Sequence, residues 1–248
     1  MKKILEVSNL KKNYHTEQKE IMALKNISFD LQEGEFISIV GPSGCGKSTI
    51  LSILAGLEDK SDGSISFSKN KKIAYMLQND SLLPFRTILE NCCIGLEIKH
   101  QLNAKTKKYV LDLLDTYGLH DFIHQYPDSL SGGMRQRVAL IRTLAVQPDI
   151  LLLDEAMSAL DYQSRLSIGE DIYKIIKQEG KTAIMVTHDI GEAISMSDRV
   201  IVLSQRPATI KKIYEISFQN KSTPIQNRKD ANFSKYFDDI WRDLNDYL

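Results

Sequence analysis

Residues 36 to 48 read FISIVGPSGCGKS, and the fold follows from the change of composition inside this stretch. The first five residues are nearly continuous β-formers, which is typical of a strand buried on both faces. The glycine-rich run after them fits the pattern G-x-x-x-x-G-K-[ST], whose bare backbone N–H groups surround a phosphate because glycine places no side chain in the way. Residues 47 to 57 then predict a helix that ends near Gly56. The order of strand, loop and helix predicts a phosphate-binding α/β unit.

The glycine-rich loop supplies the first candidate ligands. In this pattern Lys47 contributes a point charge to the β- and γ-phosphates of a nucleotide, and Ser48 offers a hydroxyl to Mg²⁺. A Gly/Ser turn that matches by chance is the alternative, but the flanking strand and helix favour a phosphate loop. We expect the converging N–H dipoles to favour the thiolate of Cys45. The predicted nucleotide contacts are Gly41, Pro42, Ser43, Gly44, Cys45, Gly46, Lys47, Ser48 and Thr49.

Two acids follow a second apolar strand, which is predicted at residues 150 to 153. Asp154 is placed to hold Mg²⁺ through water, and Glu155 is placed to accept a proton from an attacking water. The alternative is an ordinary strand end with two solvated acids. That interpretation would be the better one if apolar residues followed by Asp and Glu were the only motif in the chain. The phosphate loop in the same chain favours the metal and base roles.

Strands and helices alternate along most of the chain, which predicts an α/β fold with a parallel sheet. Short strands with turns are expected from residue 4 to residue 36, and a charged turn at 58–63. Helices are expected within 84–130 and at 160–177, and a polar linker at 219–230. The remaining predicted strands are residues 73–77, 182–186, 199–204 and 210–218.

The composition excludes several classes of protein. The 248 residues carry 32 Lys and Arg against 32 Asp and Glu, and this zero net charge offers no overall attraction to nucleic acid. The three cysteines are odd in number and lack the spacing of a zinc site, so a reducing compartment fits best. No run approaches the roughly 20 apolar residues of a membrane span. We therefore expect a protein that binds no nucleic acid and is cytosolic unless a partner recruits it.

Residues 130 to 137 read LSGGMRQR and contain a second candidate anion site. Ser131, Gly132 and Gly133 at a helix start would present exposed N–H groups and a hydroxyl. This octapeptide resembles the signature motif of the ATP-binding cassette ATPases. The resemblance implies that the signature of one subunit binds the γ-phosphate of ATP held by the phosphate loop of the other subunit. One loop and one signature in the chain then imply a head-to-tail pair of copies.

Other positions of the cassette pattern are filled by the same resemblance. Tyr14 is similar to the aromatic residue that stacks on adenine, with simple packing as the alternative. Gln78 is similar to the glutamine that touches Mg²⁺ and the attacking water and that joins the helical insertion to the core. His188 matches the histidine that contacts the γ-phosphate, although a single histidine after a strand is more often structural. Asp161 closes the run Ser158-Ala159-Leu160-Asp161, which matches a loop that communicates across the dimer.

The resemblance covers roughly residues 3 to 218 and implies the fold of a P-loop NTPase. It implies a cassette domain at 1–218, with a parallel sheet, an antiparallel β subdomain and a helical subdomain inserted at roughly 80–145. Residues 219–248 would form a linker and a helical tail. The chain departs from the common cassette pattern at Ile141, Ala156 and Met157. These positions do no chemistry, so they affect the assignment of the subfamily and not that of ATPase activity.

Residues 81 to 91, SLLPFRTILEN, resemble the segment that follows the glutamine in importers of nitrate, sulfonate and taurine, which usually have tryptophan where Phe85 stands. The resemblance implies an importer ATPase subunit at the cytoplasmic face of the membrane. It would use ATP and Mg²⁺, pair with a second copy, and work with transmembrane permease subunits and an extracytoplasmic solute-binding protein. The alternatives are a soluble cassette ATPase of the iron–sulfur assembly type, an exporter ATPase, and a regulatory module that binds ATP without turnover.

Two further stretches allow two interpretations each. Residues 82–85 predict either an apolar groove for a short helix of a membrane subunit or plain core packing. The C-terminal stretch predicts an amphipathic helix that packs on its own cassette or on a partner chain. Its acidic polar face argues against binding to anionic lipid. The apolar positions of this helix are Phe233, Tyr236, Phe237, Ile240, Trp241, Leu244, Tyr247 and Leu248.

Overall fold

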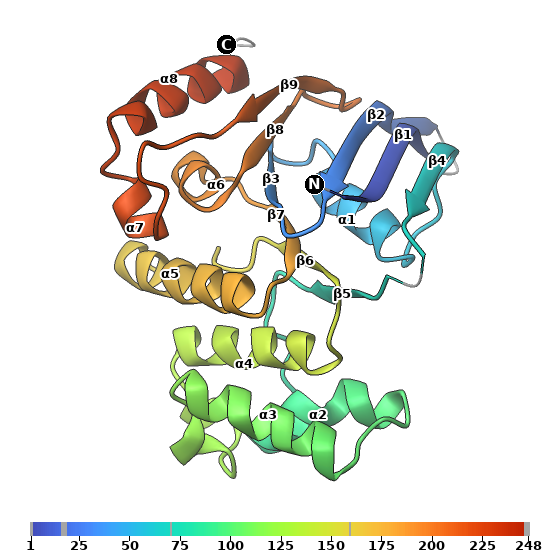
Figure 1. The fold of residues 1–248 in the computed structure, drawn as a ribbon. Coiled ribbons are helices and arrows are strands. Elements are labelled where there is room, and N and C mark those ends of the chain that lie inside the picture. Colours follow the sequence, from blue (N-terminus) through green and yellow to red (C-terminus); the bar gives the residue numbers. More distant parts are fainter. Residues whose placement is uncertain (1, 16–18, 70, 159, 246–248) are drawn as a thin grey trace.

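The computed structural model describes residues 2–15, 19–69, 71–158 and 160–245, and a six-stranded sheet lies at its centre (Figure 1). Five strands run parallel and the last, β9, is antiparallel to its neighbour β8. Every residue of β3, β6 and β7 is buried, which explains their nearly continuous apolar sequences. The predicted α/β fold with a parallel sheet is confirmed. The strand order is β5 (Ile73–Met76), β6 (Ile150–Asp154), β7 (Thr182–Val186), β3 (Phe36–Val40), β8 (Arg199–Leu203) and β9 (Ile210–Glu215).

A second, antiparallel sheet has the order β2 (Glu20–Gln32), β1 (Lys3–His15) and β4 (Asp62–Phe67). Strands β1 and β2 are longer than the short strands that we expected, and β4 begins inside the expected turn at 58–63. Leu10 and Leu24 of this sheet are fully buried in one cluster with Ile50 and Leu51 of α1 (Lys47–Leu54). The core of the sheet is therefore continuous with the helix that follows the phosphate loop.

Helix α1 ends at Leu54, because Gly56 has a left-handed backbone conformation with φ of 71° and turns the chain away. Helix α5 (Tyr162–Gln178) packs against the inserted helix α4 (Gly132–Ala145). Helix α6 (Ile190–Met196), which the sequence pattern did not reveal, packs against β3. No helix in the described ranges is both long and apolar enough to cross a membrane.

The inserted helices lie together below the sheet in Figure 1 and are called the helical subdomain. Thr87 and Asn103 cap two of them in capping boxes, which explains where these helices begin. Val138 and Ile141 of this subdomain belong to the same buried cluster as Leu151 and Ile172 of the core. The helical subdomain consists of α2 (Ile88–Ile98), α3 (Ala104–Thr116), the 3-10 helices η1 (His120–Phe122) and η2 (Pro127–Ser129), and α4 (Gly132–Ala145).

The C-terminal tail packs on its own chain. It contains the short helix α7 (Pro224–Asn227), inside the stretch expected to be a linker, and then α8 (Ala231–Asn245). Ile240 is fully buried against a cluster that includes Tyr214 and Phe218, and the Tyr214 hydroxyl donates to Asp243 Oδ2 at 2.5 Å. These contacts favour the own-cassette alternative. Trp241 departs from the expected apolar face because it is 56% exposed, and Tyr247 and Leu248 lie outside the described residues.

Candidate functional site

The phosphate loop joins β3 to α1 and is held together by Lys47. The Lys47 ammonium donates to the carbonyl oxygens of Gly41 at 2.9 Å and Pro42 at 3.1 Å, and the side chain is buried. Gly46 has φ of 120°, and a Cβ there would lie 2.8 Å from Leu24 Cδ2, so only glycine fits. The loop is therefore closely packed from behind, with its lysine folded over it. Pro42, Ser43, Gly44 and Cys45 face an open hollow of about 420 Å³, together with Gln205 and Arg206.

The side chain of Cys45 does not behave as the sequence suggested. Its thiol is 1% exposed and belongs to the buried cluster behind the loop. Burial raises the pKa of Cys45 above its ordinary value, and this effect outweighs the opposing charge of Lys47. The expected thiolate is wrong, because the backbone of Cys45 belongs to the loop while its side chain points into the core.

Asp154 at the end of β6 lies against the start of α1. Its Oδ1 accepts a hydrogen bond from Ser48 Oγ at 2.9 Å, and its Oδ2 accepts one from the Tyr75 hydroxyl at 2.7 Å. A hydroxyl and a carboxylate fit Mg²⁺, which proteins bind through one or two carboxylates together with the substrate's phosphates. Within the described ranges no group of three or more His, Cys, Asp or Glu side chains is placed to hold a metal by itself. Sequence reasoning missed Tyr75, although its position on the strand just before Gln78 was a signal.

Glu155, Gln78 and His188 meet at one carboxylate oxygen. Gln78 Nε2 donates to Glu155 Oε2 at 3.2 Å, and His188 Nδ1 lies 3.4 Å from the same atom. The three residues follow β5, β6 and β7, whose carboxyl ends meet at the edge where open α/β sheets bind ligands. Glu155 has φ of 44°, which is uncommon for a residue with a side chain, and its N–H is held by Val186 O at 2.9 Å. Such strained backbone is concentrated at functional sites.

Tyr14 lies beside the phosphate loop. Its hydroxyl is 3.3 Å from Thr49 Oγ1, and the Lys12 ammonium lies 4.9 Å from the centroid of its ring. Desolvation raises the pKa of Tyr14. The structure therefore brings this aromatic residue to the first turn of α1, and its adenine contact stays a prediction.

The signature residues begin α4 and face a hollow of their own. Ser131 caps the helix by accepting from the Met134 N–H at 3.3 Å, and Asp161 caps α5 by accepting from two N–H groups at 3.1 Å each. The hollow measures about 540 Å³, and its described lining includes no residue of the phosphate loop. One chain therefore presents two separate half-sites. The lining consists of Ser131, Gly132, Gly133, Met134, Arg137, Leu160, Asp161, Ser164, Ser167 and Ile168, while Ala159 lies outside the described residues.

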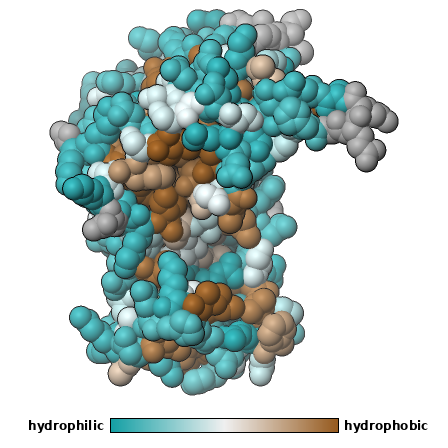
Figure 2. All heavy atoms as spheres, turned by 90° about the vertical axis from the view of Figure 1, so that its right-hand side faces the viewer, coloured by the Kyte–Doolittle hydropathy of each residue, from teal (hydrophilic) through white to brown (hydrophobic). Residues whose placement is uncertain are grey.

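The segment after Gln78 divides between core and surface. Leu82 is 9% exposed and belongs to the core cluster, whereas Phe85 is 74% exposed. Figure 2 shows apolar atoms on the surface of the lower, helical part of the molecule. Asn91, whose buried position the sequence did not indicate, accepts from the Leu83 N–H at 2.7 Å and donates to three carbonyl oxygens around the turn. The core-packing interpretation thus holds for Leu82, and docking of a membrane subunit at the exposed Phe85 stays a prediction.

Comparisons with known proteins agree with this arrangement. The family model described as "ABC transporter" matches residues 24–158. An uncharacterized ABC transporter ATP-binding protein, YtlC of Bacillus subtilis (strain 168), is 44% identical over 97% of this chain and 95% of its own length. The nitrate import ATP-binding protein NrtC of Synechococcus elongatus is 40% identical over 80% of this chain, but over only 32% of its own length. The aliphatic sulfonates import ATP-binding protein SsuB of Bacillus cereus (strain ATCC 10987 / NRS 248) is 38% identical over 84% of each chain.

A solved structure supports the fold as well. The dimeric structure of MJ0796, a bacterial ABC transporter cassette, superimposes with a TM-score of 0.74 at 33% identity, over 86% of this chain and 99% of that one. A post-hydrolysis structure of the same cassette, bound to ADP and Pi, has a TM-score of 0.73 at 31% identity. The resemblance read from the signature motif is therefore confirmed, and the chain belongs to the ABC transporter family as an ATP-hydrolysing, ATP-binding protein.

Proposed function

We propose that this chain is the ATPase subunit of an importer for a small solute such as nitrate, a sulfonate or taurine. It would act at the cytoplasmic face of a membrane, on permease subunits that receive solute from an extracytoplasmic binding protein. The printed names of two relatives, for nitrate import and aliphatic sulfonate import, support this solute class. We assign the cassette to residues 1–218, with the inserted helices at roughly 80–145, and the tail to 219–248.

The hydrolytic chemistry is assigned to the ends of β5, β6 and β7. The observation that carries it is the contact of Gln78 and His188 with the same oxygen of Glu155, next to Asp154. Glu155 accepts the proton of the attacking water, Gln78 orients that water, and His188 contacts the γ-phosphate. Lys47 and the N–H groups of its loop bind the β- and γ-phosphates. Mg²⁺, held by Ser48, Asp154 and Gln78, would neutralise charge that develops on the phosphates.

A second copy completes the site. The phosphate loop and the signature face separate hollows on one chain, so ATP on the loop of one copy needs Ser131, Gly132 and Gly133 of another. Asp161 would lie at the contact between the copies, and Tyr14 would stack on adenine. The dimeric structure of the MJ0796 cassette supports a pair of this kind. Closure of the pair on MgATP would then move the permease through the segment 78–91.

Uptake measurements test the importer assignment. A strain without this gene should lose uptake of one labelled solute among nitrate, an aliphatic sulfonate and taurine. The wild-type gene should restore that uptake, and the Lys47→Ala variant should not, because a buried triphosphate loses a charge-assisted partner worth about 1.5–3 kcal/mol. Phosphate release by the purified protein in MgATP serves as the control for ATPase activity. Normal uptake of all three solutes in the deletion strain would overturn the proposed solute class.

A further inference from the structure

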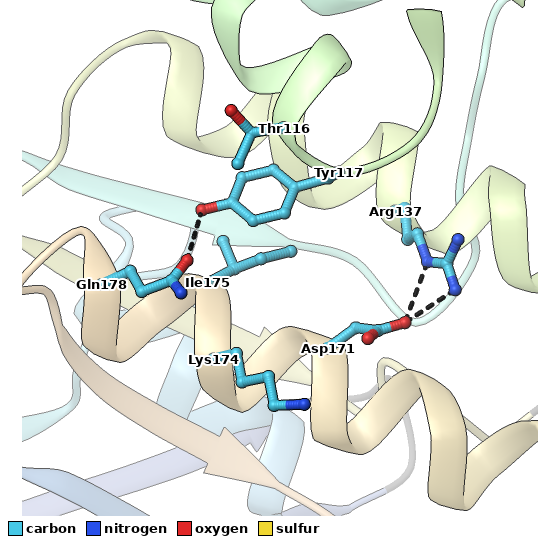
Figure 3. Close-up of a pocket in the computed structure, with 7 residues that line it drawn as sticks. All are labelled: Thr116, Tyr117, Arg137, Asp171, Lys174, Ile175 and Gln178. Carbon is cyan, nitrogen blue, oxygen red and sulfur yellow. Dashed lines mark hydrogen bonds and ion pairs between the residues drawn. The ribbon is translucent and has the colours of Figure 1, made fainter.

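A hollow of about 300 Å³ separates part of the helical subdomain from α5 (Figure 3). One polar contact crosses it at each side. Arg137 reaches from α4 to Asp171 on α5, and the Tyr117 hydroxyl donates to Gln178 Oε1 at 3.3 Å. The hollow leaves this part of the contact between α4 and α5 without side chains to fill it. Its lining consists of Thr116, Tyr117, Arg137, Asp171, Lys174, Ile175 and Gln178.

Arg137 lies between two hollows of the surface. It sits in the second turn of α4, as the last residue of the signature, and it lines both the hollow of Figure 3 and the signature hollow. Its Nε and Nη2 both donate to Oδ2 of Asp171, at 3.1 and 2.7 Å. Two donors from a planar guanidinium constrain direction as well as distance. The signature end of α4 is therefore tied to one carboxylate of α5.

The same face of α5 supports Gly133 of the signature. A Cβ on Gly133 would lie 2.9 Å from Ile168 Cδ1, so the backbone of the signature rests directly on Ile168. Ile168 and Asp171 are three residues apart on α5 and therefore neighbours on one face of that helix. The ammonium of Lys174, the next cation on this face, pairs with Glu170 Oε1 at 3.3 Å and not with Asp171. The carboxylate of Asp171 therefore forms its ion pair with Arg137.

We propose that Arg137 is a positioning residue that acts through Asp171 to hold Ser131, Gly132 and Gly133 in the place where they meet ATP on a second copy. The proposal rests on the shared-site dimer proposed above. Loss of the Arg137 to Asp171 pair leaves the chain's own phosphate loop intact but lets the signature end of α4 shift, because the hollow beside Arg137 leaves room for the movement. Monomeric ATP binding and ATP-induced dimerisation should therefore respond differently.

The experiment uses the full chain with Glu155→Gln, so that bound ATP persists. Three variants are added to it: Arg137→Gln, Asp171→Asn, and the exchange of Arg137→Asp with Asp171→Arg. Binding of a fluorescent ATP analogue to dilute monomer and the ATP concentration for half-maximal dimerisation, by sedimentation, are measured for each. Each single variant should keep its monomer affinity and need about tenfold more ATP to dimerise, and the exchange should restore most of the loss. Tyr117→Phe, which removes the contact at the other side of the hollow, is the control and should dimerise like its parent.

Three results with the variants would overturn the proposal by itself. Dimerisation of both single variants at the parental ATP concentration would show that the pair does not position the signature. A loss with Arg137→Gln but not with Asp171→Asn would mean that Arg137 acts on the nucleotide directly. An exchange variant that melts at the parental temperature yet dimerises no better than the single variants would exclude the pair as the cause. If the Glu155→Gln parent itself stays monomeric in MgATP, the shared-site dimer is wrong, and this inference falls with it.

Discussion

The Tyr75 hydroxyl donates a hydrogen bond to Asp154 Oδ2 at 2.7 Å, while Ser48 donates to the other oxygen of the same carboxylate at 2.9 Å. Asp154 is 6% exposed, so water has little access to either oxygen. Burial, together with the neighbouring carboxylate, raises the pKa of Tyr75, which keeps its hydroxyl protonated as a donor. A buried charge at the proposed metal site thus depends on a residue outside every motif of the sequence.

Tyr75→Phe keeps the ring and removes only this donor. We expect the free energy of unfolding to fall by about 1.5–3 kcal/mol, because a hydrogen bond to a buried charged group is lost. Urea unfolding without nucleotide measures the change. Tyr126→Phe, at a tyrosine that is 50% exposed, is the matched control and should leave stability unchanged. A Tyr75→Phe protein as stable as wild type would show that Asp154 does not need this donor.

Glu155→Gln should separate ATP binding from hydrolysis. The amide keeps the size of the acid but cannot accept a proton from water, and loss of a general base typically costs about 10²- to 10⁴-fold in rate. The variant should also form a stable dimer in MgATP on size-exclusion chromatography, because a negative charge next to the γ-phosphate is gone. Wild type should dimerise only transiently, and both proteins should be mostly monomeric without nucleotide. Phosphate release at the wild-type rate would show that Glu155 is not the base.

Phe85 and Leu82 should respond in opposite ways to replacement by alanine. Phe85→Ala should keep basal ATPase activity and stability, because Phe85 is exposed. It should weaken the free energy of binding to the permease by about 2 kcal/mol or more, because an aromatic anchor is lost. Leu82→Ala should lose about 2–5 kcal/mol of stability, because Leu82 lies in the core. Thermal melting and pull-down of the permease measure the two effects. Unfolding of Phe85→Ala in solution would contradict the proposed docking role.

Alkaline pH should destabilise the fold through its buried thiols. Burial raises the pKa of Cys45, Cys92 and Cys93, while in the unfolded chain a thiol ionises at about pH 8.5. Above that pH the unfolded state binds fewer protons than the folded state. The contribution of the protonated thiols to the free energy of unfolding is therefore complete below about pH 8.5 and is lost as the pH rises. Urea unfolding at pH 7.5 and at pH 9.5 should show the loss. A protein with all three cysteines replaced by alanine should lose less, and an equal loss in both proteins would exclude the thiols as its source.

The local parts of this protein could be predicted from its residues alone. The phosphate loop at 41–48 and the signature at 130–137 are contiguous, and each needs only glycines, a few polar groups and a helix start to define its backbone. Strands β6 and β7 were equally readable, because covering both faces of a parallel strand requires an unbroken apolar run. Strand β4 was not, because a stretch that begins Asp62-Gly63 has the composition of a turn and forms a strand by pairing with β1.

Which side chains meet became visible only in the folded chain. Tyr75 and Asp154 are 79 positions apart and Arg137 and Asp171 are 34 apart, so neither pair leaves a pattern in the chain. Cys45 shows the same limit inside a motif, since the loop defines its backbone whereas the packing behind the loop decides that its thiol is buried. An apolar pattern predicts that one face of a helix will be buried but not which surface buries it. In α8 the apolar face packs on its own cassette through Ile240. Contacts between residues that are distant in the sequence form only when helices and strands pack together, because they depend on the shapes and charges of the surfaces that meet.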